Sequence, residues 1–263
     1  MKHPLLCVIL VLGLLGSPAV HAESIRETPV VKVIQKCAPM VVNISTERQV
    51  MLQQNPFWGA YGGQLDAFYN NNLNQFNQVV GTMNLQSLGS GVLVSGDGLI
   101  VTNAHVAGMA SKIFVTLQDG KTAEATLIGT DNENDIALIR IPVDKPAPHI
   151  ALSEDVLIGE TVVSIGNPLG LQNSVSAGVI SGIGRIFTAN PPATQVFRDL
   201  LQTDAPINQG SSGGALINLE GKLVGINFVV VQNAQGLGFA IPSGKIEKML
   251  EEYEKVRPDR KKN

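Results

Sequence analysis

The stretch QTDAPINQGSSGGALI, residues 202–217, is the most informative part of this sequence. Two serines stand inside its glycine-rich segment, residues 210–214, and an apolar run begins directly afterwards. Glycines allow a tight backbone turn in which neighbouring amide N–H groups and a serine side chain point at one spot. The segment therefore predicts a nucleophilic serine, although taken alone it is also compatible with a flexible loop.

A serine hydroxyl is a weak nucleophile and needs an adjacent base, so the histidines decide whether the prediction holds. The chain has four, and two of these, His3 and His21, lie in the N-terminal segment considered below. His105 follows the apolar run 99–102, whereas His149 stands in a proline-rich segment that we expect to be exposed. His105 is the favoured base, with His149 as the alternative.

A neutral imidazole acting as base needs an acceptor, usually a carboxylate, to orient its second nitrogen. Asp135 stands directly before the apolar run 136–141, where an acid without a partner would be unfavourable. The chain order His105, Asp135, Ser212 is that of the two-barrel serine proteases and differs from the order in subtilisins and α/β-hydrolases. Ser211 is the rival nucleophile, and Asp204 is the rival acid.

Short apolar runs at regular intervals predict the fold class. Glycine-rich turns separate them, and no long helical pattern intervenes, which favours an all-β protein built of barrels or sandwiches. A hairpin turn is expected at 95–98. The expected strands are 40–45, 90–94, 99–102, 113–117, 123–129, 136–141, 161–165, 175–183, 214–217, 223–231 and 237–241.

Two short helices are expected at the ends of this strand-rich region. Residues 26–38 carry apolar side chains at helical spacing, with Cys37 on the buried stripe and Pro39 ending the helix. Residues 243–255 show a second apolar stripe, with Ser243 as the expected N-cap. The basic residues 256–263 follow as a solvated tail.

Composition excludes several classes of protein. The chain has 263 residues, is 44% hydrophobic and carries a net charge of −3, so it is not intrinsically disordered. Its weak negative charge argues against nucleic acid as a partner. Two cysteines and four histidines are too few for a zinc ribbon or a disulfide framework. We expect no metal and no cofactor.

The N-terminus has the pattern of a secretory signal peptide. A basic head precedes the apolar run 4–16, and small residues precede Glu23, so residues 1–22 are expected to be cleaved. The run is shorter than the roughly 20 residues of a membrane-spanning helix, and we expect no stable membrane anchor after cleavage. Export to the periplasm is favoured, with an extracellular location as the alternative. Cys37 would then be the only cysteine.

Residues 53–78 differ from the rest of the chain because they are rich in Gln, Asn and aromatic side chains and lack strand or helix periodicity. They form the centre of a predicted loop, residues 47–87. A mobile polar linker is one interpretation. A loop that docks on another surface is the other, because linkers seldom concentrate aromatic residues.

Across residues 27–250 the sequence resembles the HtrA/Deg family of trypsin-like serine proteases. Five motifs carry the resemblance in order: TNAHV at 102–106, NDIAL at 134–138, GNPLG at 166–170, QTDAPINQGSSGGAL at 202–216, and GLGFAIP at 236–242. The resemblance implies a chymotrypsin/trypsin-like double six-stranded β-barrel over residues 23–255. The site would lie in the cleft between the barrels.

Carried over by position, the resemblance assigns catalytic roles. Ser212 is the nucleophile, His105 the base and Asp135 the orienting acid, while the backbone N–H groups of Gly210 and Ser212 form the oxyanion hole. Ser211 stands where the family usually has asparagine, and Asp204 becomes structural.

The resemblance also places a substrate pocket, with walls at 206–210, 225–229 and 236–240. None of these residues is charged, which predicts cleavage after small or medium aliphatic residues. Residues 225–227 are expected to pair with an extended substrate as an added strand, which requires an unfolded segment. The predicted substrate-binding residues are Ile207, Asn208, Gln209, Gly225, Ile226, Asn227, Phe228, Leu237 and Phe239.

Taken together, we expect a periplasmic serine endopeptidase that acts on unfolded or damaged polypeptides. The family further implies a homotrimer, a regulatory loop at 53–78 and a sensor loop at 183–200. The C-terminal PDZ domain common in the family is not expected here. The alternatives are a latent protease fold that acts as a holdase or scaffold, and a β-rich adhesin.

Overall fold

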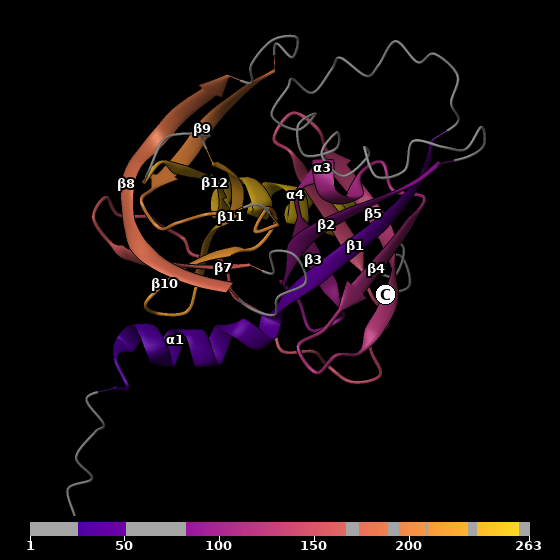
Figure 1. Cartoon of the computed structure of the whole chain (residues 1–263), viewed down its shortest axis with the longest axis horizontal. Coiled ribbons are helices and arrows are strands. Elements are labelled where there is room, and N and C mark those ends of the chain that lie inside the picture. Colours follow the sequence, from indigo (N-terminus) through magenta and orange to yellow (C-terminus); the bar gives the residue numbers. More distant parts are fainter. Residues whose placement is uncertain are drawn as a thin grey trace, which may run out of the picture.

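Two closed antiparallel barrels lie side by side and account for the strands of the structure (Figure 1). The computed structural model describes residues 26–50, 83–166, 174–188, 195–208, 210–230 and 236–257. Each barrel has six strands, so the expected double six-stranded β-barrel is confirmed. The signal peptide expected at 1–22, the centre of the expected loop at 53–78 and most of the basic tail lie outside the described residues. The bounds of that loop, 47–87, need correction, because residues 47–50 and 83–87 lie in strands that pair with each other.

The first barrel has the strand order β1-β2-β3-β6-β5-β4 and closes where β1 pairs with β4. The expected turn at 95–98 joins β2 to β3, which pair antiparallel. β3 is buried along its whole length, because it lies in the barrel wall beside both β2 and β6. The strands are β1 (Val41–Val50), β2 (Met83–Leu93), β3 (Leu99–Thr102), β4 (Lys112–Thr116), β5 (Thr122–Asp131) and β6 (Ile136–Arg140).

The second barrel has the strand order β10-β11-β12-β9-β8-β7 and closes where β10 pairs with β7. Its strands β8 and β9 form a long ribbon that arches along the outer side of the barrel (Figure 1). The strands are β7 (Thr161–Gly166), β8 (Ser174–Thr188), β9 (Val196–Thr203), β10 (Ala215–Asn218), β11 (Leu223–Val230) and β12 (Gly238–Pro242).

The expectation of a sensor loop over residues 183–200 needs correction. Residues 183–188 belong to β8 and residues 196–200 belong to β9, which the sequence did not predict. β9 was missed because Arg198 and Asp199 interrupt its apolar pattern, and both are exposed. Residues 189–194 lie outside the described residues.

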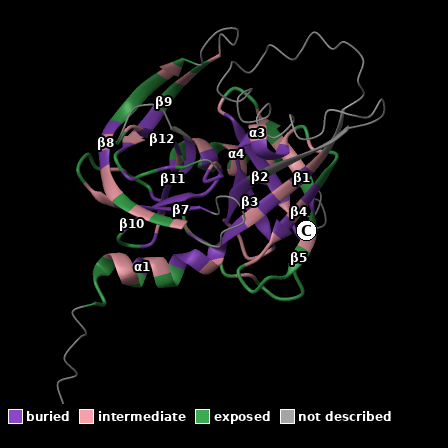
Figure 2. Ribbon diagram, in the orientation of Figure 1, coloured by how far each residue is buried: buried purple, intermediate pink, exposed green. Residues whose placement is uncertain are grey.

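Buried residues lie on strands of both barrels (Figure 2), and their hydrophobic side chains form a core that joins the two barrels. It contains side chains of the first barrel, such as Ile44 and Ile100, and side chains of the second, such as Ile165 and Ile226, all fully buried. Apolar burial contributes roughly 25 cal/mol for each Å² removed from water, so this shared core favours one fixed arrangement of the barrels.

The N-terminal helix α1 (Pro29–Cys37) is shorter than the expected 26–38. The Thr28 hydroxyl accepts a hydrogen bond from the Val31 N–H at 3.3 Å and caps the helix. A 3₁₀ turn, η1 (Ala38–Met40), continues through Pro39, so the proline does not end all helical structure. Cys37 is fully buried, as predicted, and burial raises the pKa of its thiol.

The C-terminal helix α4 (Ser243–Val256) confirms the second expected helix but not its cap. Pro242 occupies the N-cap position, and the Ser243 hydroxyl donates instead to the Ser153 carbonyl at 3.0 Å. At the other end, Arg257 pairs with Asp97 of the first barrel at 2.7 Å. Among the described residues, no helix has the length and apolar character needed to cross a membrane.

Ile246 is the anchor of α4, because its side chain is fully buried in the shared core. We expect Ile246→Ala to lower the free energy of unfolding by about 2–5 kcal/mol, since it removes buried methylene groups and leaves a cavity. Urea unfolding followed by circular dichroism measures the change. Ile158→Ala is the matched control, because Ile158 is 68% exposed and its truncation should cost less than about 0.5 kcal/mol.

Candidate active site

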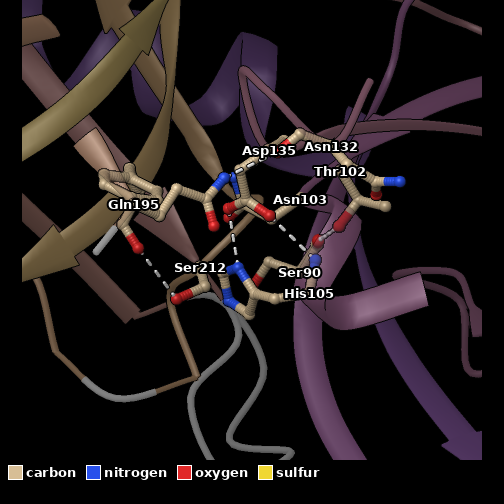
Figure 3. Close-up of polar contacts among 9 residues, drawn as sticks. Ser90, Thr102, Asn103, His105, Asn132, Asp135, Gln195 and Ser212 are labelled. Atoms are coloured by element: carbon tan, nitrogen blue, oxygen red, sulfur yellow. Dashed lines mark hydrogen bonds and ion pairs between the residues drawn. The ribbon is translucent and has the colours of Figure 1, made fainter. Parts of the chain in front are cut away.

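His105 lies on a short helical turn, α3 (Ala104–Ala107), directly after β3. The sequence placed it at the end of that strand. Its imidazole Nδ1 lies 2.7 Å from Asp135 Oδ2, and its backbone N–H donates to Asp135 Oδ1 at 2.8 Å (Figure 3). Both carboxylate oxygens of Asp135 therefore hold the same histidine, one through the ring and one through the backbone.

The backbone of Asp135 is also fixed. Its carbonyl accepts from the Ala104 N–H and from the Asn103 side-chain amide, each at 3.1 Å. Its φ is 57°, a left-handed conformation that costs a residue other than glycine about 1–3 kcal/mol. The surrounding hydrogen bonds sustain this conformation, which turns the carboxylate back toward α3.

The ion pair sets the protonation of His105. Burial by itself would lower the pKa of the imidazole, but the charge of Asp135 and its hydrogen bond outweigh burial and raise the pKa above the ordinary 6.5. With Nδ1–H donated to the carboxylate, the neutral ring keeps Nε2 as a free proton acceptor. This arrangement suits a general base that is stabilised once protonated.

Ser212 lies in the glycine-rich turn of the second barrel and is gathered with His105 and Asp135 (Figure 3). Its hydroxyl donates to the Phe228 carbonyl at 3.3 Å. Among the described contacts, no hydrogen bond joins this hydroxyl to the His105 ring. The nucleophile expected from sequence is therefore next to its base but bonded to another acceptor.

The turn is docked onto the first barrel by Ser90, a fully buried residue of β2. The Ser90 N–H donates to the Ser212 carbonyl and its hydroxyl donates to the Gly210 carbonyl, both at 2.8 Å. The Ser90 carbonyl in turn accepts from the Thr102 hydroxyl at 2.7 Å. Sequence reasoning missed Ser90 and Thr102, whose only signal is a polar residue within an apolar strand.

The backbone N–H groups of the turn divide into two sets. Those of Ser211, Gly213 and Gly214 donate to carbonyls within 2.9 Å. Those of Gly210 and Ser212 donate to no described residue, although Gly210 is buried. These two groups are the ones that the sequence predicted for an oxyanion hole, and a partially negative oxygen would satisfy both.

The structure places the three rival residues in other surroundings. Ser211 is buried against Gly166, where a β-carbon would lie within 2.8 Å of the serine Cβ. Asp204 accepts from the Val179 N–H at 2.7 Å, in the second barrel. His149 is exposed and its Nδ1 lies 3.2 Å from the Ala147 carbonyl. His105, Asp135 and Ser212 are the residues brought together.

The predicted substrate strand at 225–227 is wrong in position. Gly225 and Ile226 are paired with β10 on one side and with β12 on the other, so neither edge is free. The Asn227 N–H donates to the Gly214 carbonyl, which extends the pairing by one residue. A single sequence cannot show which edges of a strand are occupied. Among the described residues, the pairing with β10 ends before Phe228, so the part of β11 without a partner on that side begins there.

The remaining predicted binding residues differ in how far they are buried. Ile207 and Phe239 are buried, Leu237 is half-buried and Asn208 is exposed, while Gln209 lies outside the described residues. Phe228 joins a cluster of aromatic rings that sequence reasoning missed. Its ring centroid lies 4.6 Å from that of Phe197 and 6.1 Å from that of Phe187, both on the β8–β9 ribbon.

Comparison with known proteins agrees with this geometry. The pattern of the trypsin-like peptidase domain matches residues 89–226. The chain belongs to the HtrA family of trypsin-like serine proteases. A DegP-like periplasmic serine endoprotease of Halomonas elongata is 37% identical over 255 residues, which cover 92% of this chain and 52% of that protein. The serine protease HhoB of Synechocystis is 38% identical, over 81% of this chain and 50% of its own length.

Solved structures of the HtrA family share the fold. An HtrA-type protease with a decapeptide is 31% identical, with a TM-score of 0.68, over 86% of this chain and 67% of its own. The serine endoprotease of Yersinia pestis is 33% identical, with a TM-score of 0.64, over 87% and 68% respectively. The chain spans about half the length of the curated relatives it matches.

Gly213 is a position of the turn that leaves no room for a side chain. Its φ is 79°, and a β-carbon there would overlap the Ser90 carbonyl and the Thr102 hydroxyl. We expect Gly213→Ala to cost about 3 kcal/mol or more of unfolding free energy and to abolish labelling of Ser212 by a fluorophosphonate.

Gly120→Ala is the matched control for this variant. Gly120 has a φ of 83° but open space around the position of a β-carbon. It should lose only the roughly 1–2 kcal/mol of left-handed strain and keep full labelling. Equal losses of labelling in the two variants would contradict a steric role for Gly213 in the site.

Proposed function

We propose that the chain is a periplasmic serine endopeptidase that hydrolyses peptide bonds of unfolded or damaged proteins. One observation carries this proposal: the 2.7 Å hydrogen bond between His105 and Asp135 lies beside a turn that holds Ser212 and two N–H groups that donate to no described residue. A base, its orienting acid, a nucleophile and an anion site are together the requirements for acyl transfer.

The first half of the reaction forms an acyl-enzyme. The Ser212 hydroxyl leaves the Phe228 carbonyl, passes its proton to His105 Nε2 and attacks the carbonyl carbon of the substrate peptide. The N–H groups of Gly210 and Ser212 bind the oxygen that becomes negative, and Asp135 stabilises the imidazolium. His105 then protonates the leaving amine, and the acyl group stays on Ser212.

The second half releases the acyl group. With the amine gone, His105 takes a proton from water, and the resulting hydroxide attacks the ester carbon. The same two N–H groups bind the second oxyanion, and the proton returns from His105 to Ser212 as the acid departs. The enzyme is restored with one peptide bond hydrolysed and one water consumed.

The surroundings of the turn support an extended, apolar substrate. The free edge of β11 offers backbone hydrogen bonds to a substrate strand, and folded proteins seldom present such a segment. The buried side chains of Ile207 and Phe239 are uncharged, which favours cleavage after small aliphatic residues. An assembly of three copies and export by residues 1–22, with an extracellular destination as the alternative, belong to the same proposal.

A second candidate function is a latent protease fold that holds unfolded clients without cleaving them. The hydrogen bond from Ser212 to Phe228, in place of one to His105, favours this alternative. A resting site of this kind would require a change at Ser212 before any reaction. A client-aggregation assay measures holdase activity independently of cleavage.

Digestion of β-casein by the exported protein and by Ser212→Ala tests the first candidate. We expect the wild type to degrade casein and the variant to lose all but a trace of activity, since the loss of the nucleophile costs about 10⁶ in kcat. Mass spectrometry of the fragments should show cleavage after residues such as Val. Equal digestion by both proteins would exclude Ser212 as the nucleophile. An intact substrate with unlabelled Ser212 would favour the holdase.

The pH dependence of Ser212 labelling tests the role of Asp135. His105 acts as a base only when neutral, and Asp135 raises its pKa, so labelling should fall below a midpoint that lies above 6.5. In Asp135→Asn the imidazolium loses its anionic partner, and the midpoint should move to lower pH. The plateau rate should fall by about 10⁴. A midpoint that does not move in the variant would contradict the assignment of the ion pair.

A further inference from the structure

We propose that Lys245 of α4 is a positioning residue that keeps the carboxylate of Asp135 oriented toward His105. This inference rests on the proposed function, because it concerns the general base of that reaction. Lys245 touches neither His105 nor Ser212 in any described contact. It acts through the two segments that it joins, one from each barrel.

The Lys245 ammonium binds both barrels at once. Its Nζ donates to the Asn134 side-chain oxygen at 2.8 Å, in the loop between β5 and β6. It also donates to the Arg198 carbonyl at 2.7 Å, in β9 of the second barrel. A third hydrogen bond joins the same two parts of the chain: the Gln195 side chain donates to the Asn132 carbonyl at 2.8 Å. We call the two hydrogen bonds of the Lys245 ammonium, to Asn134 and to Arg198, the ammonium clamp.

Each of the two residues that the ammonium clamp holds stands directly before an aspartate. Asn134 precedes Asp135, and Arg198 precedes Asp199. Asp135 and Asp199, with φ of 57° and 55°, are the two non-glycine residues with a left-handed backbone in the described part of the chain. Such residues persist only where their surroundings fix them. Lys245 fixes the residue before each, so it restrains the strained backbone that aims the Asp135 carboxylate.

The position of Lys245 is unfavourable unless these contacts are made. It stands in the first turn of α4, where the helix dipole disfavours a cation. Burial lowers the pKa of its ammonium, and this effect exceeds the opposing influence of Asp199, Asp131 and Glu133. A lysine side chain also loses rotamer entropy when it is held in place. The hydrogen bonds to Asn134 and Arg198 compensate for these costs.

The ammonium clamp lies in a cleft of about 600 Å³ between the loop before Asp135, β9 and α4. The charged groups that line this cleft are Asp131 at the end of β5, Glu133 of the loop, Arg198 and Asp199 of β9, and Lys248 and Glu252 of α4. Asn134 is braced there by Asp131, which accepts from its backbone N–H at 3.0 Å and its side-chain amide at 2.7 Å. Loss of the lysine leaves Asn134 attached to its own loop but released from the second barrel.

Three variants test the inference. Lys245→Met removes the ammonium and keeps the length of the side chain, Lys245→Arg restores a cationic donor, and Lys248→Met removes the other lysine of the same cleft. The first readout is the pKa of His105 by NMR titration, with the exposed His149 as reference in the same spectrum. The second is kcat and KM on a peptide substrate.

We expect Lys245→Met to lower the NMR pKa of His105, because Asp135 no longer faces the ring as closely. We expect kcat to fall by roughly 10- to 100-fold with little change in KM, since a displacement of about 1 Å has an effect of this size. Lys245→Arg should recover most of both losses, and Lys248→Met should match the wild type. A His105 titration that is the same in Lys245→Met and Lys248→Met would overturn the inference.

The NMR titration does not require catalytic turnover, so the proposed protease function and the proposed role of Lys245 can be contradicted independently. A wild type that cleaves nothing, with a His105 pKa that still falls in Lys245→Met, would count against the protease and support the clamp. If Lys245→Met does not fold, Asn134→Ala removes the same contact from the loop side. It should then lower the His105 pKa, and an unchanged value would overturn the inference.

Discussion

The docking of the glycine-rich turn onto β2 is the constraint on which the site depends. His105 and Asp135 belong to the first barrel, whereas Ser212 and its N–H groups belong to the second. Ser90 crosses between them with two hydrogen bonds of 2.8 Å to the turn. Both bonds are buried, and breaking one would leave a polar group without a partner at a cost of about 1–3 kcal/mol. A shared apolar core holds the barrels together, and these polar contacts set their register.

Around this contact the chain adopts conformations that are individually unfavourable. Gly213 and Asp135 both have positive φ, one made possible by the absence of a side chain and the other sustained by hydrogen bonds. Each aims a polar group: the turn presents N–H groups that donate to no described residue, and Asp135 presents its carboxylate to the imidazole. The two stable barrels keep these unfavourable backbone conformations in place. The strained residues of the site are therefore found where the two barrels meet.

Much of this arrangement could be predicted from the sequence, and the omissions have physical causes. Apolar runs predicted eleven of the strands, and the chain order of His105, Asp135 and Ser212 predicted their convergence. β9 was missed because charged residues interrupt it. The substrate edge was placed too early on β11, because pairing on both sides of Gly225 depends on distant strands. Ser90 and Lys245 were missed for the same reason: their roles depend on contacts with residues far away in the sequence, which no local pattern indicates.

The division of the site between two barrels also has a consequence for failure under stress. If the barrels separate, the Ser90 contacts with the turn break, because they are hydrogen bonds of 2.8 Å that cross the interface. Ser212 then moves away from His105 while the strands of each barrel are still paired. The geometry of the site therefore depends on the interface between the barrels as well as on the fold of each barrel, and a local opening at the interface removes it without global unfolding. A copy whose barrels have separated would therefore keep both folded barrels and lose the arrangement of His105, Asp135 and Ser212.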